Sequence, residues 1–367
     1  MHDRLSLALE ALRPKALSRR GVIAGLTAGL TAFGLAGASA PAAAEIAEHE
    51  QALYDAALAA GETQITWYTA QTGGETAQAI GAAFEARYPG LRVNVSRTTA
   101  QVAYQRLTQE LMANSLQVDV LSSTVTSHYN ALKEQGALMA YRPVNSEAYF
   151  EDFRNLADPD DMFHITSAGL TVITYNTDLV APEDVPTSWL DLLDPKWANQ
   201  VSVGHPGFSG YVGYWVLMMD QLFGWEYFEK LAEGDPQIGR SINDTITMLN
   251  ARERSVAAGA TGTTLISASR GNPLGLAYPK EGAILMTTPS AIMAGTSAPN
   301  TAKLFMEFLT GQEYGTIMSQ DFTEALRPDV EPPVGAKPLS EVILLQPTDV
   351  DDGIPRVIEL WRDTFGI

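Results

Sequence analysis

The sequence predicts an α/β protein of two lobes, each a sheet flanked by helices, joined by two extended crossings. Runs typical of strands and runs typical of helices alternate over residues 63–136 and again over 201–280. This order favours parallel sheets covered by helices. Two long apolar runs, 163–179 and 283–295, interrupt it, and each is long enough to cross between lobes. Lobes joined in this way leave a cleft in which a ligand can bind.

The predicted elements follow one another with short connections. An amphipathic helix over 46–60 ends at Gly61. The further elements are strands at 63–70, 91–97, 118–123 and 201–205, helices at 99–115, 126–136 and 300–320, a helix and turn at 186–200, and a closing helix in the tail to Ile367. This pattern predicts a first lobe of residues 45–170 and 284–367 and a second lobe of residues 171–283.

Residues 1–44 predict a signal peptide that directs the chain to the periplasm. Arg19 and Arg20 precede a short apolar stretch, and two small-x-small sites follow at 38–40 and 42–44. The arginine pair after a serine favours a twin-arginine (Tat) signal, while an ordinary Sec signal is the alternative. An uncleaved membrane anchor is disfavoured because the stretch is short. The absence of cysteine fits an oxidising compartment.

Charge and composition exclude several classes of partner. The chain has 24 basic and 43 acidic residues, a net charge of −19, which disfavours nucleic acid and anionic membrane surfaces. Without cysteine, neither a disulfide nor a thiolate metal site can form. A small anion stays compatible with this charge, because a local group of backbone N–H donors acts at short range.

The stretch GHPGFSGYVGYW, residues 204–215, predicts such a group of donors. A strand-like run precedes it and an apolar helix-like run follows it. Gly210 allows a ligand to approach the backbone closely, and the free amides of a helix start attract negative charge. Ser209, Gly210 and Tyr211 are therefore candidate anion ligands. The alternative is that Ser209 is only a helix N-cap.

The chain also resembles a known family over nearly all of residues 45–367. The resemblance lies in ITWYTAQTGG, VDVLSSTVTSHYNALKEQGAL, GLTVITYNTDLV, PTSWLDLLDPKWANQV and YPKEGAILMTTPSAIMAGTSAPNTAKLFMEFLTGQEYG. These stretches resemble the type II periplasmic solute-binding proteins of ABC importers, in the group related to ferric-iron and phosphonate binders. The resemblance implies a two-lobed protein that closes on a ligand and delivers it to an ABC permease in the inner membrane.

The resemblance further implies where iron ligands would lie, and this chain departs from that pattern. Ferric binders use a histidine or nearby residue after the first strand, an acid after the third, and two adjacent tyrosines in the second lobe. Here these places hold 71–73 (Gln-Thr-Gly), Thr124, and 259–264 without a tyrosine. Fe³⁺ prefers anionic oxygen ligands. We therefore expect an organic phosphonate, phosphate ester or carboxylate as cargo, with ferric iron as the alternative.

Further candidate ligand-binding residues lie at strand ends and crossings, because ligands of parallel sheets collect at the carboxyl ends of strands. They are Thr69, Gln71, Thr72 and Gly73 after the first strand, Arg97 after the second, Ser122, Ser123 and Thr124 after the third, Tyr175 and Tyr278 near the crossings, and Asn243 before a helix. The alternatives are plain turns, a solvated arginine, a helix cap and packed tyrosines.

No catalytic arrangement, metal-ligand spacing or cofactor motif stands out in the sequence. The run GFSGY lacks the second glycine of a nucleophile elbow, and the five histidines are not spaced as metal ligands. The sequence therefore predicts a monomeric binding protein without catalytic residues, metal or cofactor. An exported hydrolase is the alternative from the enzymes.

Overall fold

The computed structural model describes residues 46–367, and the predicted signal peptide lies outside the described residues. The described chain contains one mixed sheet, with the main strand order β2-β1-β3-β10-β5-β8-β6-β7. Its strands are β1 (Gln64–Thr69), β2 (Arg92–Arg97), β3 (Val120–Ser122), β4 (Leu138–Met139), β5 (His164–Asn176), β6 (Val201–Val203), β7 (Gln237–Ile238), β8 (Val256–Ala260), β9 (Leu274–Ala277), β10 (Ala283–Met293) and β11 (Leu344–Leu345).

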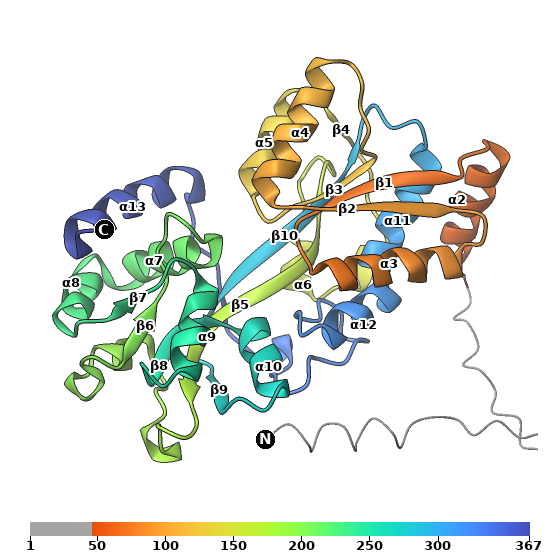
Figure 1. The fold of residues 1–367 in the computed structure, drawn as a ribbon. Helices are drawn as coiled ribbons and strands as arrows, with labels where there is room; N and C mark the ends of the chain where they lie inside the picture. Colours follow the sequence, from red (N-terminus) through yellow and green to blue (C-terminus); the bar gives the residue numbers. More distant parts are fainter. Residues whose placement is uncertain (1–45) are drawn as a thin grey trace, which may run out of the picture. The chain divides into compact units, whose positions relative to one another are not determined.

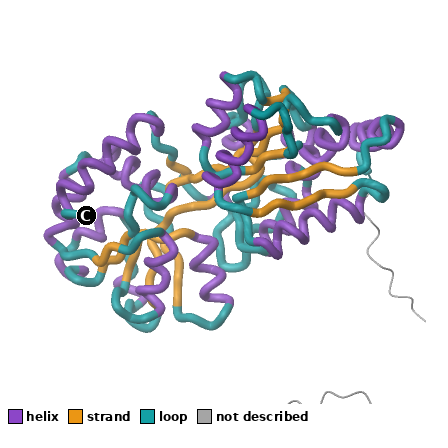
Figure 2. Tube along the Cα trace, turned by 45° about the horizontal axis from the view of Figure 1, so that its top comes forward, coloured by secondary structure: helices purple, strands orange, loops and turns teal. Residues whose placement is uncertain are grey.

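Helices cover both faces of this sheet, as Figure 2 shows. They are α2 (Glu48–Ala59), α3 (Gly74–Arg87), α4 (Ala100–Met112), α5 (Thr126–Glu134), α6 (Glu151–Arg154), α7 (Gly210–Phe223), α8 (Glu226–Glu233), α9 (Ile242–Asn250), α10 (Thr261–Ser269), α11 (Pro299–Thr310), α12 (Gln312–Gln320) and α13 (Val350–Phe365). Short 3-10 helices lie at Val144–Ala148, Pro182–Asp184, Trp189–Leu193, Pro195–Trp197 and Leu339–Glu341. No helix among residues 46–367 is long and apolar enough to span a membrane.

The first part of the sheet has the predicted strand–helix alternation. Strand β1 pairs in parallel with both β2 and β3, and helices α3 and α4 form the connections between these strands. Trp67 of β1 is fully buried and packs edge-on against Phe305 of α11, and Phe84 of α3 completes this aromatic core. The carboxyl ends of three parallel strands therefore share one edge, where the predicted polar residues lie.

Two long strands, β5 and β10, run side by side through the middle of the described chain (Figure 1). They pair antiparallel from Ile284 opposite Thr171 to Ser290 opposite His164, with an irregularity between Thr288 and Pro289. Strand β10 pairs with β3, and β5 pairs with β8. These two strands are the predicted extended crossings, because they connect the parallel strands at either end of the sheet.

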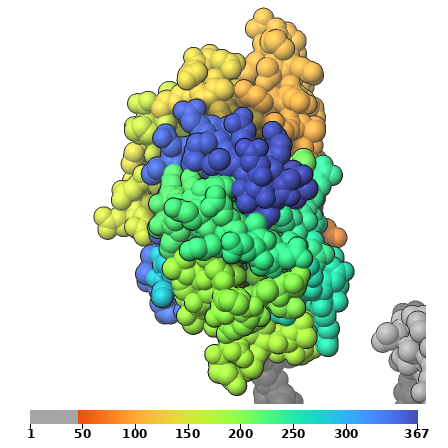
Figure 3. Space-filling view, turned by 90° about the vertical axis from the view of Figure 1, so that its left-hand side faces the viewer, coloured from red at the N-terminus to blue at the C-terminus, as the bar shows by residue number. Residues whose placement is uncertain are grey.

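The second part of the sheet is built around β8, β6 and β7, which pair in parallel. Trp215 of α7, Phe228 of α8 and Trp361 of α13 are buried together in its aromatic core. Figure 3 shows α13 in blue over the green helices α7 and α8, on which it packs. The last helix thus packs on helices of the predicted second lobe, although 284–367 was assigned to the first. The lobe boundaries stay a prediction.

One predicted helix and one predicted helical turn take a different form in the structure. The run 300–320 forms two helices, α11 and α12, because Gly311 between them has extended dihedrals (φ −81°, ψ 168°). Residues 189–193 and 195–197 form 3-10 helices in place of an α-helix, since Pro195 interrupts the run. The single helix over 300–320 is therefore a wrong prediction.

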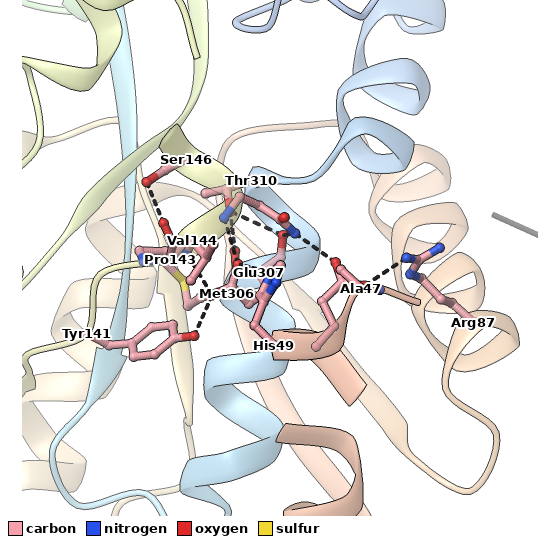
Figure 4. A network of polar contacts seen from close by, with 12 residues as sticks. Ala47, His49, Arg87, Tyr141, Pro143, Val144, Ser146, Met306, Glu307 and Thr310 are labelled. Carbon is pink, nitrogen blue, oxygen red and sulfur yellow. Dashed lines mark hydrogen bonds and ion pairs between the residues drawn. The ribbon is translucent and has the colours of Figure 1, made fainter. Parts of the chain in front are cut away.

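A buried carboxylate fastens α2 to the rest of the structure (Figure 4). Glu307 of α11 is 0% exposed. It accepts hydrogen bonds from the Tyr141 hydroxyl and from the amides of Val144 (2.8 Å) and Asn145 (2.9 Å). His49 of α2 lies 3.4 Å from the same carboxylate. This network holds the first described helix against α11, far from it in sequence.

Candidate functional site

The run 204–215 connects β6 to α7, as predicted. Ser209 is the N-cap residue, and its side chain makes no capping hydrogen bond. The first amides of an α-helix have no acceptor within the helix, and Gly210 is exposed. The start of α7 therefore presents donors to a ligand. Gly204 permits this arrangement, because a Cβ there would lie 2.5 Å from Val212 and 2.9 Å from the backbone of Ser241.

The start of α7 rests on the middle of the two long strands. A Cβ on Gly169 of β5 would lie 2.1 Å from the Tyr211 hydroxyl, and a Cβ on Gly210 would lie 2.7 Å from Cε of Met286 in β10. Gly169 and Met286 are themselves partners in the β5–β10 pairing. Tyr211 thus covers a strand position that only glycine fits. Burial, and then the nearby charge of Glu324, raise the pKa of Tyr211 to about 12.

Four polar residues form a row across the carboxyl ends of the first strands. Thr69 of β1 lies opposite Arg97 of β2 on one side and opposite Ser122 of β3 on the other. Ser122 in turn lies opposite Ser290 of β10. Three of the four were predicted as ligand residues. The pairing brings them side by side, because β1, β2 and β3 end at the same edge of the sheet and the antiparallel β10 passes that edge at Ser290.

A chain of hydrogen bonds connects this row to the loop after β1. Trp67 Nε1 donates to Ser122 Oγ (2.8 Å), and the Ser122 hydroxyl is hydrogen-bonded to Ser290 Oγ (2.6 Å). The Ser290 hydroxyl is in turn bonded to Thr166 Oγ1 (2.6 Å), which donates to Gln71 Oε1 (3.3 Å). Gln71 Nε2 then donates to the Tyr314 hydroxyl (2.7 Å). The structure therefore joins Ser122 and Gln71, two predicted residues, through Thr166 and Ser290. The sequence interpretation missed these two, since they lie inside the long apolar strands.

The loop after β1 is held by its own contacts. Thr69 is fully buried, and its hydroxyl accepts from the Gln71 amide at 3.5 Å. Thr72 is buried, and its hydroxyl donates to Asp321 at 3.2 Å. Arg97 is exposed, and its Nε donates to the Thr72 carbonyl at 3.1 Å. Gly73 is the exposed N-cap of α3. The side chains of Thr69 and Thr72 are thus engaged within the protein.

The loop after β3 meets helix α7. Ser123 is buried, and within residues 46–367 its hydroxyl has no hydrogen-bond partner. Thr124 is half-buried at the turn into α5. The Thr126 side chain, at the start of α5, lies close enough to the phenol of Tyr214 in α7 to oppose the rise that burial gives the pKa of that phenol. Residues of the two predicted lobes therefore touch beside the start of α7.

Three of the predicted residues make their contacts elsewhere. Tyr175 packs on Gly275 of β9 near the far end of β5. Asn243 lies exposed on α9, where its carbonyl accepts from Thr247. The Tyr278 hydroxyl accepts from the Lys337 amide at 3.1 Å. Burial and the charge of Glu324 raise the pKa of Tyr278 to about 12.

Glu324 is a buried acid that the sequence interpretation did not identify. It follows α12, is 3% exposed, and its Oε1 accepts from the Thr261 hydroxyl at the start of α10 (2.6 Å). Burial raises the pKa of Glu324 to about 7. No local pattern in a loop marks such a residue, because its burial comes from segments distant in sequence. Among residues 46–367, no group of three His, Asp or Glu side chains is placed to hold a metal ion.

Residues of the run 204–215 also line a cavity of about 360 Å³. His205, Phe208, Arg240 and Arg362 are among the residues that line it. The Arg240 guanidinium lies 5.1 Å from the centre of the Phe208 ring. Arg240 therefore faces this cavity.

Comparison of the sequence with known proteins identifies its family. A family model described as "Bacterial extracellular solute-binding protein" matches residues 118–341. A probable ABC transporter periplasmic-binding protein of Sinorhizobium fredii is 24% identical over 368 residues, covering 94% of this chain and 95% of the relative. An uncharacterized protein of Haemophilus influenzae is 24% identical over 65% of this chain and 69% of its own length.

Solved structures share the fold. Iron-bound HitA from Pseudomonas aeruginosa superposes with a TM-score of 0.68 at 21% identity, covering 82% of this chain and 99% of HitA. AfuA from Actinobacillus pleuropneumoniae, with fructose-6-phosphate bound, gives a TM-score of 0.67 at 21% identity, covering 83% of this chain and 99% of AfuA. These similarities confirm the predicted two-lobed α/β fold of the type II periplasmic binding proteins.

Proposed function

The chain belongs to the bacterial extracellular solute-binding proteins and is the periplasmic substrate-binding component of an ABC transporter, and we propose that its cargo is a small organic anion. The cargo class is a phosphonate, a phosphate ester or a carboxylate. It is bound between the predicted lobes, 45–170 with 284–367 and 171–283, at the start of α7. Its delivery partner is an ABC permease of the inner membrane.

The start of α7 is the observation that carries the proposal. The helix is 14 residues long and begins at the exposed Gly210, and the Ser209 side chain makes no capping hydrogen bond. Its first amides therefore keep their hydrogen-bonding capacity for a ligand. The positive end of the helix dipole favours an anion there. Ser209 supplies a hydroxyl donor beside these amides.

The surroundings suit an anion held by neutral donors. The chain carries a net charge of −19, so a site built from backbone amides and hydroxyls gives local attraction without a basic surface. The hydroxyls of Ser123 and Thr124 lie in the loop that follows β3. Helix α5 follows this loop, and its first residue, Thr126, lies close to Tyr214 of α7. A ligand at the start of α7 would thereby contact both predicted lobes and stabilise their closed arrangement.

Ferric iron is the competing cargo, because one of the similar structures contains bound iron. HitA is iron-bound and AfuA holds fructose-6-phosphate, so this fold serves both classes of cargo. In this chain the run 259–264 at the start of α10 has no tyrosine. The first-strand loop holds Gln71, whose amide is already hydrogen-bonded to Tyr314 and Thr166. These residues favour an anion over a hard cation.

The remaining proposals follow from this mode of binding. The protein acts as a monomer, binds one ligand for each chain, and has no catalytic residues. It reaches the periplasm through the predicted signal peptide of residues 1–44, by the Tat or the Sec route. The two long strands β5 and β10 allow the lobes to move, since few other strands join the two parts of the sheet.

The proposal is tested by thermal shift and calorimetry with phosphonates, phosphate esters, carboxylates and ferric citrate. We expect saturable binding of one anion class, with a melting temperature that rises with ligand concentration. Ser209→Asp is the decisive variant, because aspartate caps a helix as well as serine does but places a carboxylate where the ligand's charge would lie. We expect it to fold normally and to weaken anion binding at least tenfold.

Ser269→Asp is the matched control. Ser269 is exposed at the end of α10, so this variant adds the same charge away from the start of α7. It should bind the anion as the wild type does. Equal binding by Ser209→Asp and the wild type, or a wild type stabilised by ferric iron and by no anion, would contradict the proposal.

A further inference from the structure

A four-residue segment after α12, residues 321–324, connects the two predicted lobes beside the ligand site. At one end Asp321 accepts from Thr72 in the loop after β1 (3.2 Å). At the other end Glu324 accepts from Thr261, the first residue of α10 (2.6 Å). Between them, the Phe322 carbonyl lies so close to α10 that a Cβ on Gly262 would be 2.9 Å from it.

Glu324 ends this segment with an unused acceptor. The residue is 3% exposed, and its Oε1 is bonded to Thr261. Its other oxygen, Oε2, is buried and has no hydrogen-bond partner within residues 46–367. A buried carboxylate oxygen without a donor is costly. Such a group in a native protein calls for a specific explanation, of which a ligand is one.

The groups around Glu324 do not neutralise it. Tyr211 from α7 and Tyr278 after β9 lie close enough for its charge to raise the pKa of both phenols. Asp321 lies on its own segment, and Glu331 lines a cavity together with Glu324. The Lys337 ammonium lies over the Tyr278 ring, 5.1 Å from its centre. Hydrogen bonding to Thr261 lowers the pKa of Glu324, but burial outweighs it. The carboxyl thus lies beside Tyr211, at the start of α7, without a cationic partner among the described residues.

We propose that Glu324 is a ligand-binding residue whose Oε2 selects anions that also carry a hydrogen-bond donor, a hydroxyl or an ammonium group. This inference rests on the proposed function, since the anionic end of the ligand occupies the start of α7. The donor end then reaches the Glu324 carboxylate beside Tyr211. A ligand with both groups satisfies Oε2, whereas a simple anion leaves it without a partner and close to a like charge.

A role as helix cap does not account for the same observations. A carboxylate that only capped α10 would be stabilised by the helix dipole and by backbone amides, and its pKa would fall. The pKa of Glu324 is instead raised to about 7, and within residues 46–367 the one hydrogen bond to its carboxylate comes from a side-chain hydroxyl, that of Thr261. This environment leaves the carboxylate ready to be stabilised further by a donor from the ligand.

The test uses calorimetry on the exported protein with three matched probes: propylphosphonate, 3-hydroxypropylphosphonate and 3-aminopropylphosphonate. We expect the hydroxyl or the ammonium probe to bind at least tenfold more tightly than the plain one, and the comparison tells which donor is preferred. Glu324→Gln keeps the shape and an acceptor for Thr261. It should remove this preference while binding propylphosphonate as well as, or better than, the wild type.

The pH profile separates ligand contact from a structural role. Because the ionised carboxylate is the acceptor, the wild-type preference for the donor-bearing probe should fall several-fold from pH 8 to pH 6. Propylphosphonate carries the same titrating phosphonate and corrects for it. In Glu324→Gln the preference should be small and independent of pH. An equal loss for all three probes, or an unchanged preference, would overturn the inference.

Two further outcomes are decisive. If Glu324→Gln fails to fold, Thr261→Val is tested in its place. This substitution removes the hydroxyl that lowers the pKa of Glu324, so the preference for the donor-bearing probe should be lost at a higher pH than in the wild type. A pH profile equal to that of the wild type would overturn the inference. A wild type that binds none of the three phosphonates, nor any other anion, removes the proposed function together with this inference. Anion binding without a Glu324-dependent preference removes the inference alone.

Discussion

Replacing Gly169 by alanine tests the contact on which the start of α7 rests. The backbone of Gly169 does not require glycine, since its φ lies outside the left-handed region. The added Cβ would, however, lie 2.1 Å from the Tyr211 hydroxyl oxygen and 3.1 Å from its Cζ. Carbon atoms pack best at about 3.5–4.0 Å, so the phenol ring must move. The new methyl therefore acts directly on a predicted ligand residue.

The expected magnitude follows from two opposing effects. Overpacking a buried contact costs about 1–3 kcal/mol, while replacing glycine within a strand contributes about 0.5–1 kcal/mol of stability. We expect Gly169→Ala to lower the free energy of unfolding by about 1–2 kcal/mol, within the range set by these two effects. In a Tyr211→Phe background the oxygen at 2.1 Å is gone and the nearest remaining ring atom is at 3.1 Å. There the same substitution should be nearly neutral.

The assay is a double-mutant cycle by urea unfolding of the wild type, the two single variants and the double variant. A coupling energy of about 1–2 kcal/mol is expected, which is typical of side chains in direct contact. Anion binding gives a second readout, since the displaced ring in Gly169→Ala should weaken it and Tyr211→Phe should restore it. Strictly additive effects would refute the packing of Tyr211 on β5, and with it this account of the site.

Two further predictions concern buried acids. Glu307→Gln should lower the free energy of unfolding by about 3 kcal/mol, because it removes a buried charge that accepts three hydrogen bonds. Urea unfolding measures this effect, and Glu313→Gln is the control because the Glu313 side chain is 44% exposed. Equal effects of the two substitutions would contradict the hydrogen-bond network of Glu307. Burial raises the pKa of Glu324 from 4.5 to about 7, so the folded state favours the protonated form. Stability from this group is fully present below pH 4.5 and is lost as the pH rises through 7. The difference in unfolding free energy between Glu324→Gln and the wild type should therefore grow by about 3 kcal/mol between pH 4.5 and 8, and a constant difference would contradict the burial of this carboxyl.

Local sequence patterns predicted the elements of the first strands well. Strand β1 and its neighbours lie where the alternation of Thr, Ile, Trp and Tyr indicated, because one face of each strand is buried against helices. The pairing of β10 between β3 and β5 could not be read from the chain, since it joins residues more than one hundred positions apart. The break between α11 and α12 was missed because the apolar spacing continues through Gly311.

The candidate site divides in the same way. The sequence could predict that Ser209 and Gly210 stand at a helix start, because a strand, a glycine turn and a helix follow one another there, whereas their contact with a ligand stays a prediction. Thr166 and Ser290 were missed because each is a single hydroxyl inside a buried strand, and its role comes from the partner across the sheet. Glu324 lies in a loop, so only the fold shows that it is buried beside α10.

The position of β10 has a consequence for how the chain is made. Residues 283–293 supply the strand that lies between β3 and β5, yet most of the polypeptide is synthesised before they are. Until they emerge, β3 and β5 each have one unpaired edge, and exposed strand edges promote association between chains. Interruption of synthesis before residue 283 should therefore yield fragments that aggregate, because the strand that closes both edges is missing from them.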